Sequence, residues 1–225
     1  SLKVMHETPD TLALSYAPLE EPRIVVNANA YACFAYSLHY RENHHPAAAK
    51  ARAIRLARWL IEQQNADGSW HYYADHEPGN FIDGFHSCFV LKNLIKAGRH
   101  IDEIAILAAD AINRGVGFID GQFFDNNQRL LKRFTERDIK DPYVWDLYDQ
   151  AEYLGLLIDL GRLEEARAFR EHVTGIFCRQ GHWYCRKDFF GRLWGKDFYR
   201  WGIMPFLYNS ALLDRSQAQG THHGG

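Results

Sequence analysis

The chain has 225 residues, a formal net charge of -2 and a pI near 6.6. This length can bury one good core, so one domain is the expectation, and the composition excludes a collagen, a coiled coil and a disordered chain. Lys and Arg are spread along helical stretches such as "KARAIRLAR" instead of forming a basic excess. We therefore predict no nucleic-acid partner.

The sequence contains no stretch near the ~18 apolar residues that cross a bilayer, and no basic-then-apolar signal segment. We expect a soluble, cytoplasmic protein with no membrane span. The chain begins with Ser1 and not with Met, which leaves open a preceding segment, signal peptide included.

Neither the cysteines nor the histidines have the spacing of a metal site. The four cysteines form no CxxC pair, and none of the 12 histidines belongs to an HExxH motif. We predict no metal, no cofactor, and free thiols in a reducing compartment at Cys33, Cys88, Cys178 and Cys185.

Taken in chain order, the apolar periodicity predicts seven helices. The second, fourth and sixth are amphipathic and charged, as outer helices facing solvent are. The first, third and fifth are richer in small, aromatic and polar residues ("NANAYACFAYSLHY"), as inner helices would be. Their expected ranges are roughly 27–43, 46–65, 81–97, 102–117, 143–160, 163–179 and 199–213.

A degenerate repeat accompanies these helices. Three times a helical pair leads into a Gly-led aromatic turn: "DGSWHYY" at Gly68, "IDGQFF" at Gly121 and "RQGHWYC" at Gly181. The intervals, about 50 to 60 residues, fit a helical hairpin plus a turn. Gly followed by aromatic residues also favours a short β-hairpin at each turn.

Alternating inner and outer helices are typical of an α/α toroid. A closed ring of six hairpins needs about twelve helices, so seven helices predict an incomplete ring. Either the chain is part of a longer protein, or it forms an open arc that is completed by another subunit, a second copy or the segment before residue 27. The predicted fold is all-α, an incomplete α/α toroid of helical hairpins with short β-turn insertions. We expect an N-terminal segment over 1–19, the toroid domain over 20–215 and a flexible tail over 216–225.

Two resemblances accompany this pattern. "ARWLIEQQNADGSW" resembles the QW motif of squalene-hopene cyclases and prenyltransferases, in which the Gln caps a neighbouring helix end and stacks on the Trp. That role is structural. No Asp-rich diphosphate-binding motif is present, since Asp146 and Asp149 do not form DDxxD, and we exclude cyclase chemistry.

The second resemblance covers nearly the whole chain. "VVNANAYACFAYSL", "DGSWHYY", "NFIDGFHSCFVLKNL", "DLYDQAEYLGLL", "HWYCRKDF" and "YRWGIMPFLYNSALL", in that order, resemble the C-terminal two-thirds of bacterial helical-toroid proteins from surface-polysaccharide gene clusters. Asp146 stands where that pattern has a His, and the N-terminal hairpins are missing. The resemblance implies a carbohydrate context and names no reaction.

Polar residues recur near the starts of the predicted inner helices, and this recurrence selects the candidate site. Groups from different hairpins that converge at one end are where such a ring would bind a ligand. The candidate catalytic residues are His86, Asp83, Asp146 and Asp149; the candidate substrate-binding residues are Asn29, Trp70, Tyr73, Gln150, Arg200 and Trp201.

Structural roles stay open for several of these residues. Asp83 is also explained as a negative charge in the first turn of a helix, and Asn29 is also explained as a helix N-cap. His86 could be a hydrogen-bonded core histidine, although we expect it to face a central cleft within reach of Asp83, Asp146 or Asp149. Aromatic residues of the Gly-led turn could stack on a sugar or pack the turn against the ring.

The function that these observations favour is a carbohydrate-active protein of the hydrolase, lyase or epimerase type, binding a saccharide or polysaccharide between inner helices. Hydrolysis would need two carboxylates ~5.5 Å apart for retention, or ~6.5 to 9.5 Å apart for inversion. Epimerisation or elimination would need a base such as His86 near a carbon-bound proton. The alternative is a non-catalytic helical scaffold, or a glycan-binding component of a polysaccharide biosynthesis complex.

Overall fold

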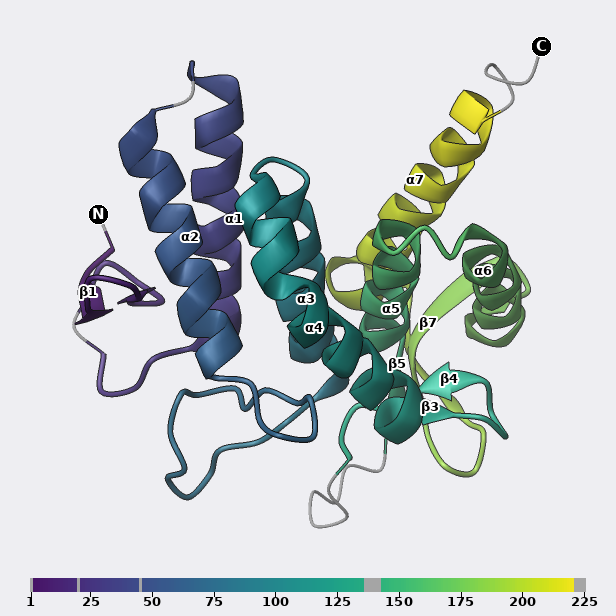
Figure 1. Ribbon diagram of the computed structural model, residues 1–225. Coiled ribbons are helices and arrows are strands. Elements are labelled where there is room, and N and C mark those ends of the chain that lie inside the picture. The colour runs from purple at the N-terminus through teal and green to yellow at the C-terminus, as the bar shows by residue number, and fades with distance from the viewer. Residues whose placement is uncertain (1, 20, 45, 136–142, 221–225) are drawn as a thin grey trace. The chain divides into compact units, whose positions relative to one another are not determined.

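The computed structural model describes residues 2–19, 21–44, 46–135 and 143–220, with side chains up to residue 216 (Figure 1). The chain forms two compact units, Ser1–Gly121 and Gln122–Gly225. Each unit has its own layers of helices and is described separately. The single toroid domain expected over residues 20–215 stays a prediction.

The first unit contains two helical hairpins and a small sheet. α1 packs against α2 and α3, α3 packs against α4, and α2 also packs against α4. α1 and α3 therefore form one layer and α2 and α4 the other, as the predicted inner and outer helices require. The elements are β1 (Val4–Glu7), β2 (Leu12–Leu14), α1 (Val26–Glu42), α2 (Ala47–Glu62), α3 (Gly84–Gly98) and α4 (Asp102–Phe118).

The burial of α2 and α3 shows why the two layers differ. α2 buries one stripe that repeats every three to four residues, including Ala49, Ala53, Leu56 and Leu60, while its other faces carry charge. α3 has neighbours on more sides, and all of its residues from Ser87 to Leu94 are buried. An inner helix of this kind can expose polar groups only near its ends.

The second unit packs α5 against α6, α7 and a π-helical turn, η2. β3 pairs with β4, and a four-stranded sheet has the order β5-β7-β6 with β8 on β7, all antiparallel. A second π-helical turn, η1 (Ile119–Phe123), follows α4. The elements are β3 (Phe124–Asp125), β4 (Leu130–Leu131), β5 (Trp145–Asp146), α5 (Leu147–Asp159), α6 (Leu163–Phe177), β6 (Cys178–Arg179), β7 (His182–Lys187), β8 (Leu193–Lys196), η2 (Tyr199–Ile203) and α7 (Met204–Gly220).

The seven predicted helices are present, and six agree with the expected ranges within a few residues. The last helix differs most: it begins at Met204 instead of residue 199, because Trp201 and Gly202 have non-helical backbone. Gly202 has φ +93, and a Cβ there would lie 3.0 Å from the Cβ of Leu147. α7 then continues to Gly220, beyond the predicted end of the domain at 215.

The small sheets make the all-α description approximate. The N-terminal segment, expected outside the domain, forms β1 and β2 and buries Leu12, Ala13 and Leu14. Gly181 joins β6 to β7 as predicted, with positive φ at Gln180 and Gly181. The turn at Gly68 also has positive φ, but its only strand-like pairing among the described residues is the bridge between Val25 and Tyr73.

Candidate functional site

Asp83 and His86 form a pair at the start of α3. Asp83 is the N-cap, and its Oδ1 accepts a hydrogen bond from the His86 backbone N–H at 2.8 Å. Its Oδ2 lies 2.6 Å from Nδ1 of the same residue. The Asp83 side chain is 2% exposed and that of His86 is 20% exposed. The predicted contact between these residues is confirmed.

This contact determines which nitrogen of His86 can accept a proton. A carboxylate only accepts hydrogen bonds, so a neutral His86 that bonds to Asp83 has its hydrogen on Nδ1 and its lone pair on Nε2. A histidine oriented through Nδ1 by a carboxylate is the arrangement of a general base. That His86 faces a central cleft stays a prediction.

Aromatic rings surround His86. The ring centroids of Phe85 and Tyr72 lie 3.9 Å and 4.6 Å from that of His86, and that of Phe89 lies 5.8 Å away. Burial raises the pKa of the Tyr72 hydroxyl, and the nearby charge of Asp83 acts in the same direction. Tyr72 is therefore a neutral phenol that can donate a hydrogen bond; the sequence indicated it only as one of the aromatic residues of the Gly-led turn that could stack on a sugar or pack the turn.

The other first-unit candidates are mainly engaged in packing. Trp70 is 3% exposed and donates from Nε1 to the Leu60 carbonyl at 2.8 Å. Asn29 is fully buried and binds the backbone N–H and carbonyl of Leu14. Tyr73 is half-buried beneath the Arg23 guanidinium, 3.8 Å from the ring centroid. Of these three residues, Tyr73 alone keeps a partly exposed ring.

Gln64 connects two segments near Trp70. Its Nε2 donates to the carbonyls of Gly68 at 2.9 Å and of Ala111 on α4 at 2.8 Å. Arg114 in turn donates to Oε1 of Gln64 at 2.5 Å. The glutamine therefore ties the end of α2 to α4, which is a structural role.

In the second unit, Asp146 is the centre of an ion-pair cluster. It is the N-cap of α5, with Oδ1 accepting from the Tyr148 backbone N–H at 2.9 Å. Its Oδ2 accepts from Nη1 of Arg133 at 3.0 Å and from Nε of Arg186 at 3.1 Å. Two guanidinium groups thus share one carboxylate that is 5% exposed.

The remaining predicted residues of this unit differ in exposure. Asp149 and Gln150 are fully buried, and Gln150 binds the backbone N–H and carbonyl of Leu131 at 2.7 and 2.8 Å. Trp201 is 48% exposed; the Arg200 guanidinium lies 5.2 Å from its ring centroid, and Tyr148 meets it edge-on at 5.6 Å. Arg200 and Trp201 are therefore accessible, whereas Asp149 and Gln150 face the core.

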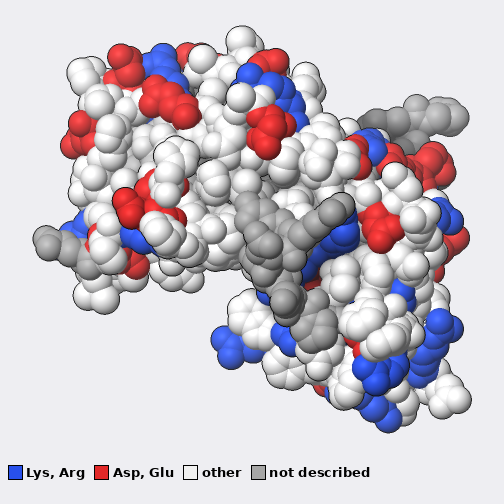
Figure 2. All heavy atoms as spheres, turned by 90° about the horizontal axis from the view of Figure 1, so that it is seen from below, with Lys and Arg blue, Asp and Glu red and all other residues white. Residues whose placement is uncertain are grey.

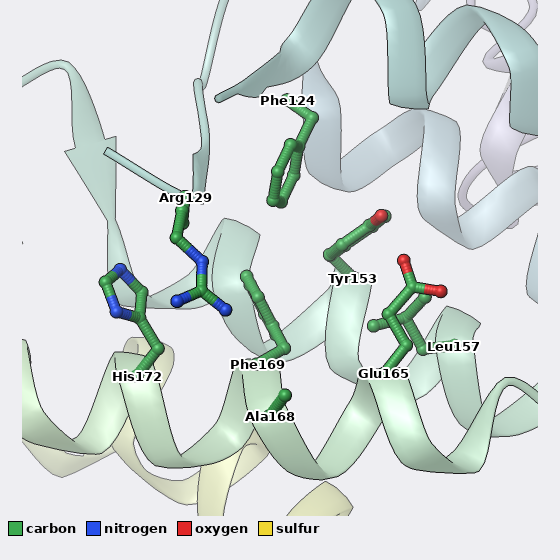
Figure 3. Close-up of a pocket in the computed structure, with 8 residues that line it drawn as sticks. All are labelled: Phe124, Arg129, Tyr153, Leu157, Glu165, Ala168, Phe169 and His172. Atoms are coloured by element: carbon green, nitrogen blue, oxygen red, sulfur yellow. The ribbon is translucent and has the colours of Figure 1, made fainter. Parts of the chain in front are cut away.

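A separate pocket of about 220 Å³ lies between α5, α6 and the β3–β4 turn (Figure 3). Arg129 and His172 lie toward one end of it and Glu165 toward the other. Arg162 already binds Glu165 through two hydrogen bonds. None of the predicted site residues lines this pocket; its lining is Phe124, Arg129, Tyr153, Leu157, Glu165, Ala168, Phe169 and His172.

The described residues contain no group of three His, Cys, Asp or Glu side chains placed to hold a metal ion. Cys33 and Cys185 are thiols that donate to backbone carbonyls, Cys33 to Ala53 and Cys185 to Phe198 and Trp201. Burial raises their pKa values, to about 12 for Cys33 and about 11 for Cys185. Such thiols are poor nucleophiles at neutral pH.

Within the described part of the chain, no helix has the length and apolar character needed to cross a bilayer.

Comparison with solved structures supports the fold. The chain resembles a cellobiose 2-epimerase from Bacillus thermoamylovorans (TM-score 0.60, 15% identity, 78% of this chain and 51% of that one). It also resembles a GH76 α-mannanase from Bacteroides thetaiotaomicron (TM-score 0.60, 10% identity, 80% of this chain and 53% of that one). A third similar structure is a sugar epimerase from a ruminal bacterium (TM-score 0.61, 12% identity, 84% of this chain and 55% of that one). These neighbours are α/α-toroid enzymes, so the chain has a helix-rich fold of the α/α-toroid type.

The chain spans about half the length of these solved structures. No family model matches the sequence. Among curated proteins, the chain is 24% identical over 105 residues to a decarboxylating 6-phosphogluconate dehydrogenase of Oryza sativa subsp. japonica, covering 46% of this chain and 22% of that protein. At that identity and coverage, the match places the chain in no family.

Proposed function

We propose that this chain is a carbohydrate-active protein that transfers a proton at a sugar carbon, as an epimerase or isomerase does. The observation that carries the proposal is the Asp83–His86 pair, with Nδ1 of His86 held 2.6 Å from Oδ2 of Asp83. The fold supports it, because solved structures of the same fold include two sugar epimerases and a D-mannose isomerase. The bacterial surface-polysaccharide context stays part of the proposal.

In this reaction His86 would act as both base and acid. Its Nε2 would take the proton from the carbon next to the carbonyl of an open-chain sugar, leaving an enediolate and a protonated imidazole next to the Asp83 carboxylate. Return of the proton to the opposite face of the same carbon, after the enediolate has turned that face toward His86, would give the epimer. Return to the neighbouring carbon, with transfer of the hydroxyl proton, would give the isomer.

Other residues would bind the sugar. Tyr72 would donate its hydroxyl hydrogen to a developing oxyanion. Within the first unit, the partly exposed ring of Tyr73 would contact a sugar face. Arg200 and Trp201 belong to the second unit and stay separate predictions of sugar-binding residues. Asp149 and Gln150 would support the first turn of α5 from the core.

Glycoside hydrolysis receives less support from the same residues. It requires one carboxylic acid and one carboxylate facing a glycosidic bond. Asp83 is engaged with His86, and Asp146 with Arg133 and Arg186. The GH76 neighbour nevertheless makes hydrolysis of a mannan oligosaccharide a necessary comparison.

The test is proton exchange with solvent. The full chain would be incubated in D2O with D-mannose and with cellobiose, and incorporation of deuterium at carbon 2 followed by NMR. We expect exchange that His86→Gln lowers by about 10²- to 10⁴-fold, the usual contribution of a general base. His172→Gln is the matched control, because His172 binds only the Gln128 carbonyl among the described residues.

Exchange that survives His86→Gln would contradict the assignment of the base. Release of reducing sugar from a mannan oligosaccharide without exchange would favour a hydrolase. If the chain shows no exchange and no hydrolysis, the non-catalytic scaffold or glycan-binding alternative is favoured. A second copy or partner protein that completes the ring is also proposed, and light scattering of the purified chain tests for the second copy.

A further inference from the structure

The end of the β7–β8 hairpin carries a row of polar and aromatic side chains on one sheet face. Arg186 on β7 pairs with Trp194 on β8 and with Asp146 on β5. Residues directly opposite each other on antiparallel strands project to the same face. Asp146, Arg186 and Trp194 are therefore neighbours across three strands.

Two arginines at this end are held in the same way. Arg186 donates from Nε to Oδ2 of Asp146 at 3.1 Å, and Arg192 donates from Nε to Oδ2 of Asp188 at 2.7 Å. Both aspartates are buried, at 5% and 2% exposure. The arginine side chains are 49% and 63% exposed.

The Nε anchors leave the outer guanidinium nitrogens available. Among the described residues, no hydrogen bond involves the Nη atoms of Arg186 or Arg192. Burial alone would raise the pKa of Asp188, but its hydrogen bonds with Arg192 lower that pKa below its usual value. The anchor of Arg192 is thus a carboxylate, and the free edge of its guanidinium faces outward. A planar fork of this kind matches a carboxylate or a phosphate in two-point hydrogen bonding.

Exposed aromatic rings accompany the two arginines. Trp194 is 44% exposed and Phe190 is 70% exposed. The Arg192 guanidinium lies 5.2 Å from the ring centroid of Phe190 and 5.7 Å from that of Trp194. Gly191, with φ +83, makes the turn that places Phe190 and Arg192 next to each other.

The local charge is positive. Residues 179–200 contain six basic and two acidic residues, and both acidic ones are engaged: Asp188 with Arg192, and Asp197 with His182. On the face drawn in Figure 2, the part of the second unit at the lower right carries Lys and Arg side chains among uncharged ones. An anionic ligand therefore complements this end of the unit.

We propose that this hairpin end binds an acidic saccharide: Arg186 and Arg192 bind its anionic group, and Trp194 with Phe190 stacks on its sugar rings. A uronate carboxylate, a sulfate and a phosphate ester share the chemistry that two guanidinium forks recognise. A neutral sugar would leave both forks without a partner. The inference goes beyond the proposed enzyme activity and does not depend on His86.

The test measures binding of a galacturonic acid tetrasaccharide to the full chain by calorimetry. The matched ligand is the same tetrasaccharide with its carboxyl groups methyl-esterified, which keeps the rings and removes the charge. We expect the esterified ligand to bind at least tenfold more weakly. Arg186→Gln and Arg192→Gln should each weaken binding of the acid about tenfold, and Trp194→Ala should weaken both ligands.

Two control variants test whether binding depends on this hairpin end. Arg170→Gln removes one positive charge from the same unit, at an exposed pair with Asp214, and should leave binding unchanged. His86→Gln should also leave it unchanged, so failure of the proposed enzyme activity would not affect the result. Circular dichroism of each variant checks that it is folded.

Three outcomes would overturn the inference. One is equal binding of the acid and its methyl ester; a second is an equal loss in Arg170→Gln, which would show non-specific attraction. The third is binding of a single-stranded oligonucleotide more tightly than any acidic saccharide, with loss in the same variants. A sulfated tetrasaccharide and inorganic phosphate, tested in parallel, distinguish a sulfated sugar and a free anion from a uronate.

Discussion

Asp83 binds His86 twice, once through the backbone and once through the ring. Oδ1 accepts the backbone N–H at 2.8 Å and Oδ2 faces the ring Nδ1 at 2.6 Å. The carboxylate that starts α3 is thus also the group that orients the imidazole. Helix stability and the proposed proton transfer depend on the same side chain.

Two substitutions at Asp83 separate these roles. Serine caps a helix about as well as aspartate does, but its single hydroxyl cannot bind both the backbone and the ring. Asp83→Ser should therefore keep the free energy of unfolding within ~0.5 kcal/mol of wild type and lower the exchange rate tenfold or more. Asp83→Ala should lose the same activity and a further ~1 kcal/mol of stability. Urea unfolding and the deuterium-exchange assay measure the two effects. Equal activity in wild type and Asp83→Ser would contradict an orienting role for the carboxylate.

The sequence predicted this pair because its signal is local. Asp83 and His86 are three residues apart, and helical spacing places such residues on neighbouring positions of one helix. The helices were predictable for the same reason: each carries its own periodic pattern. Periodicity says nothing about which distant residue a side chain meets.

The contacts that were missed depend on tertiary structure. Arg186 reaches Asp146 from 40 residues away in the chain, through the register of β5 on β7. β5 has two residues, too few for an alternating pattern to reveal it. The break before α7 was missed because it depends on Gly202 approaching Leu147.

Asn29 and Gln150 were predicted to bind a saccharide, and they make matching contacts in the two units. Each accepts a backbone N–H from a short strand and donates to the carbonyl of the same strand residue, Leu14 for Asn29 and Leu131 for Gln150. Each also donates to the carbonyl of its own helix N-cap. The repeat detected in the sequence thus extends to two buried amides that hold strands against inner helices.

Asn29→Ala and Gln150→Ala should each destabilise the protein by about 1–3 kcal/mol, because a buried backbone N–H loses its partner. The amide of Leu14 or Leu131 should then exchange faster with solvent, which hydrogen-exchange NMR measures. Asn43→Ala is the control, since Asn43 is exposed and its side chain hydrogen-bonds only with His39 among the described residues; a change within ~0.5 kcal/mol is expected. If Asn29→Ala also changes the free energy of unfolding by no more than ~0.5 kcal/mol, the hydrogen bonds of Asn29 contribute little to stability.

Two glycines of α4 should respond to alanine in opposite ways. A Cβ on Gly115 would lie 2.7 Å from Cζ3 of Trp70 and 2.8 Å from Cδ2 of Leu91, so Gly115→Ala should cost about 1–3 kcal/mol through overpacking. Beyond its chain neighbours and the nearby backbone of its own helix, Gly117 has no atom within 4 Å of that position, and Gly117→Ala should stabilise the helix by up to ~1 kcal/mol. Urea unfolding measures both changes. A stabilising Gly115→Ala would mean that Trp70 moves aside at little cost.

Arg23 and Asp75 join the segment before α1 to the loop after Tyr73. Arg23 donates from Nε and Nη2 to the two carboxylate oxygens of Asp75 at 2.8 and 2.5 Å, and its guanidinium covers the Tyr73 ring. The hydrogen bonds from Arg23 lower the pKa of Asp75 to about 2. This ion pair fixes the loop that presents Tyr73, so its loss should affect the proposed sugar binding as well as stability.

The sign of the pH dependence follows from that pKa. The folded-state pKa of Asp75 lies below the unfolded value of about 3.9, so the pair stabilises the folded chain fully above about pH 4, and this contribution is lost as pH falls through about 2. In Arg23→Gln the pKa of Asp75 should rise toward its ordinary value. The stability difference between wild type and Arg23→Gln should therefore shrink steadily between pH 4 and pH 2. Carboxyl NMR titration measures the pKa of Asp75, and urea midpoints at each pH measure the stability difference. Arg58→Gln is the control: it breaks the exposed pair with Asp10 and should leave the titration of Asp75 unchanged. An unchanged Asp75 titration in Arg23→Gln would show that the pair does not form in solution.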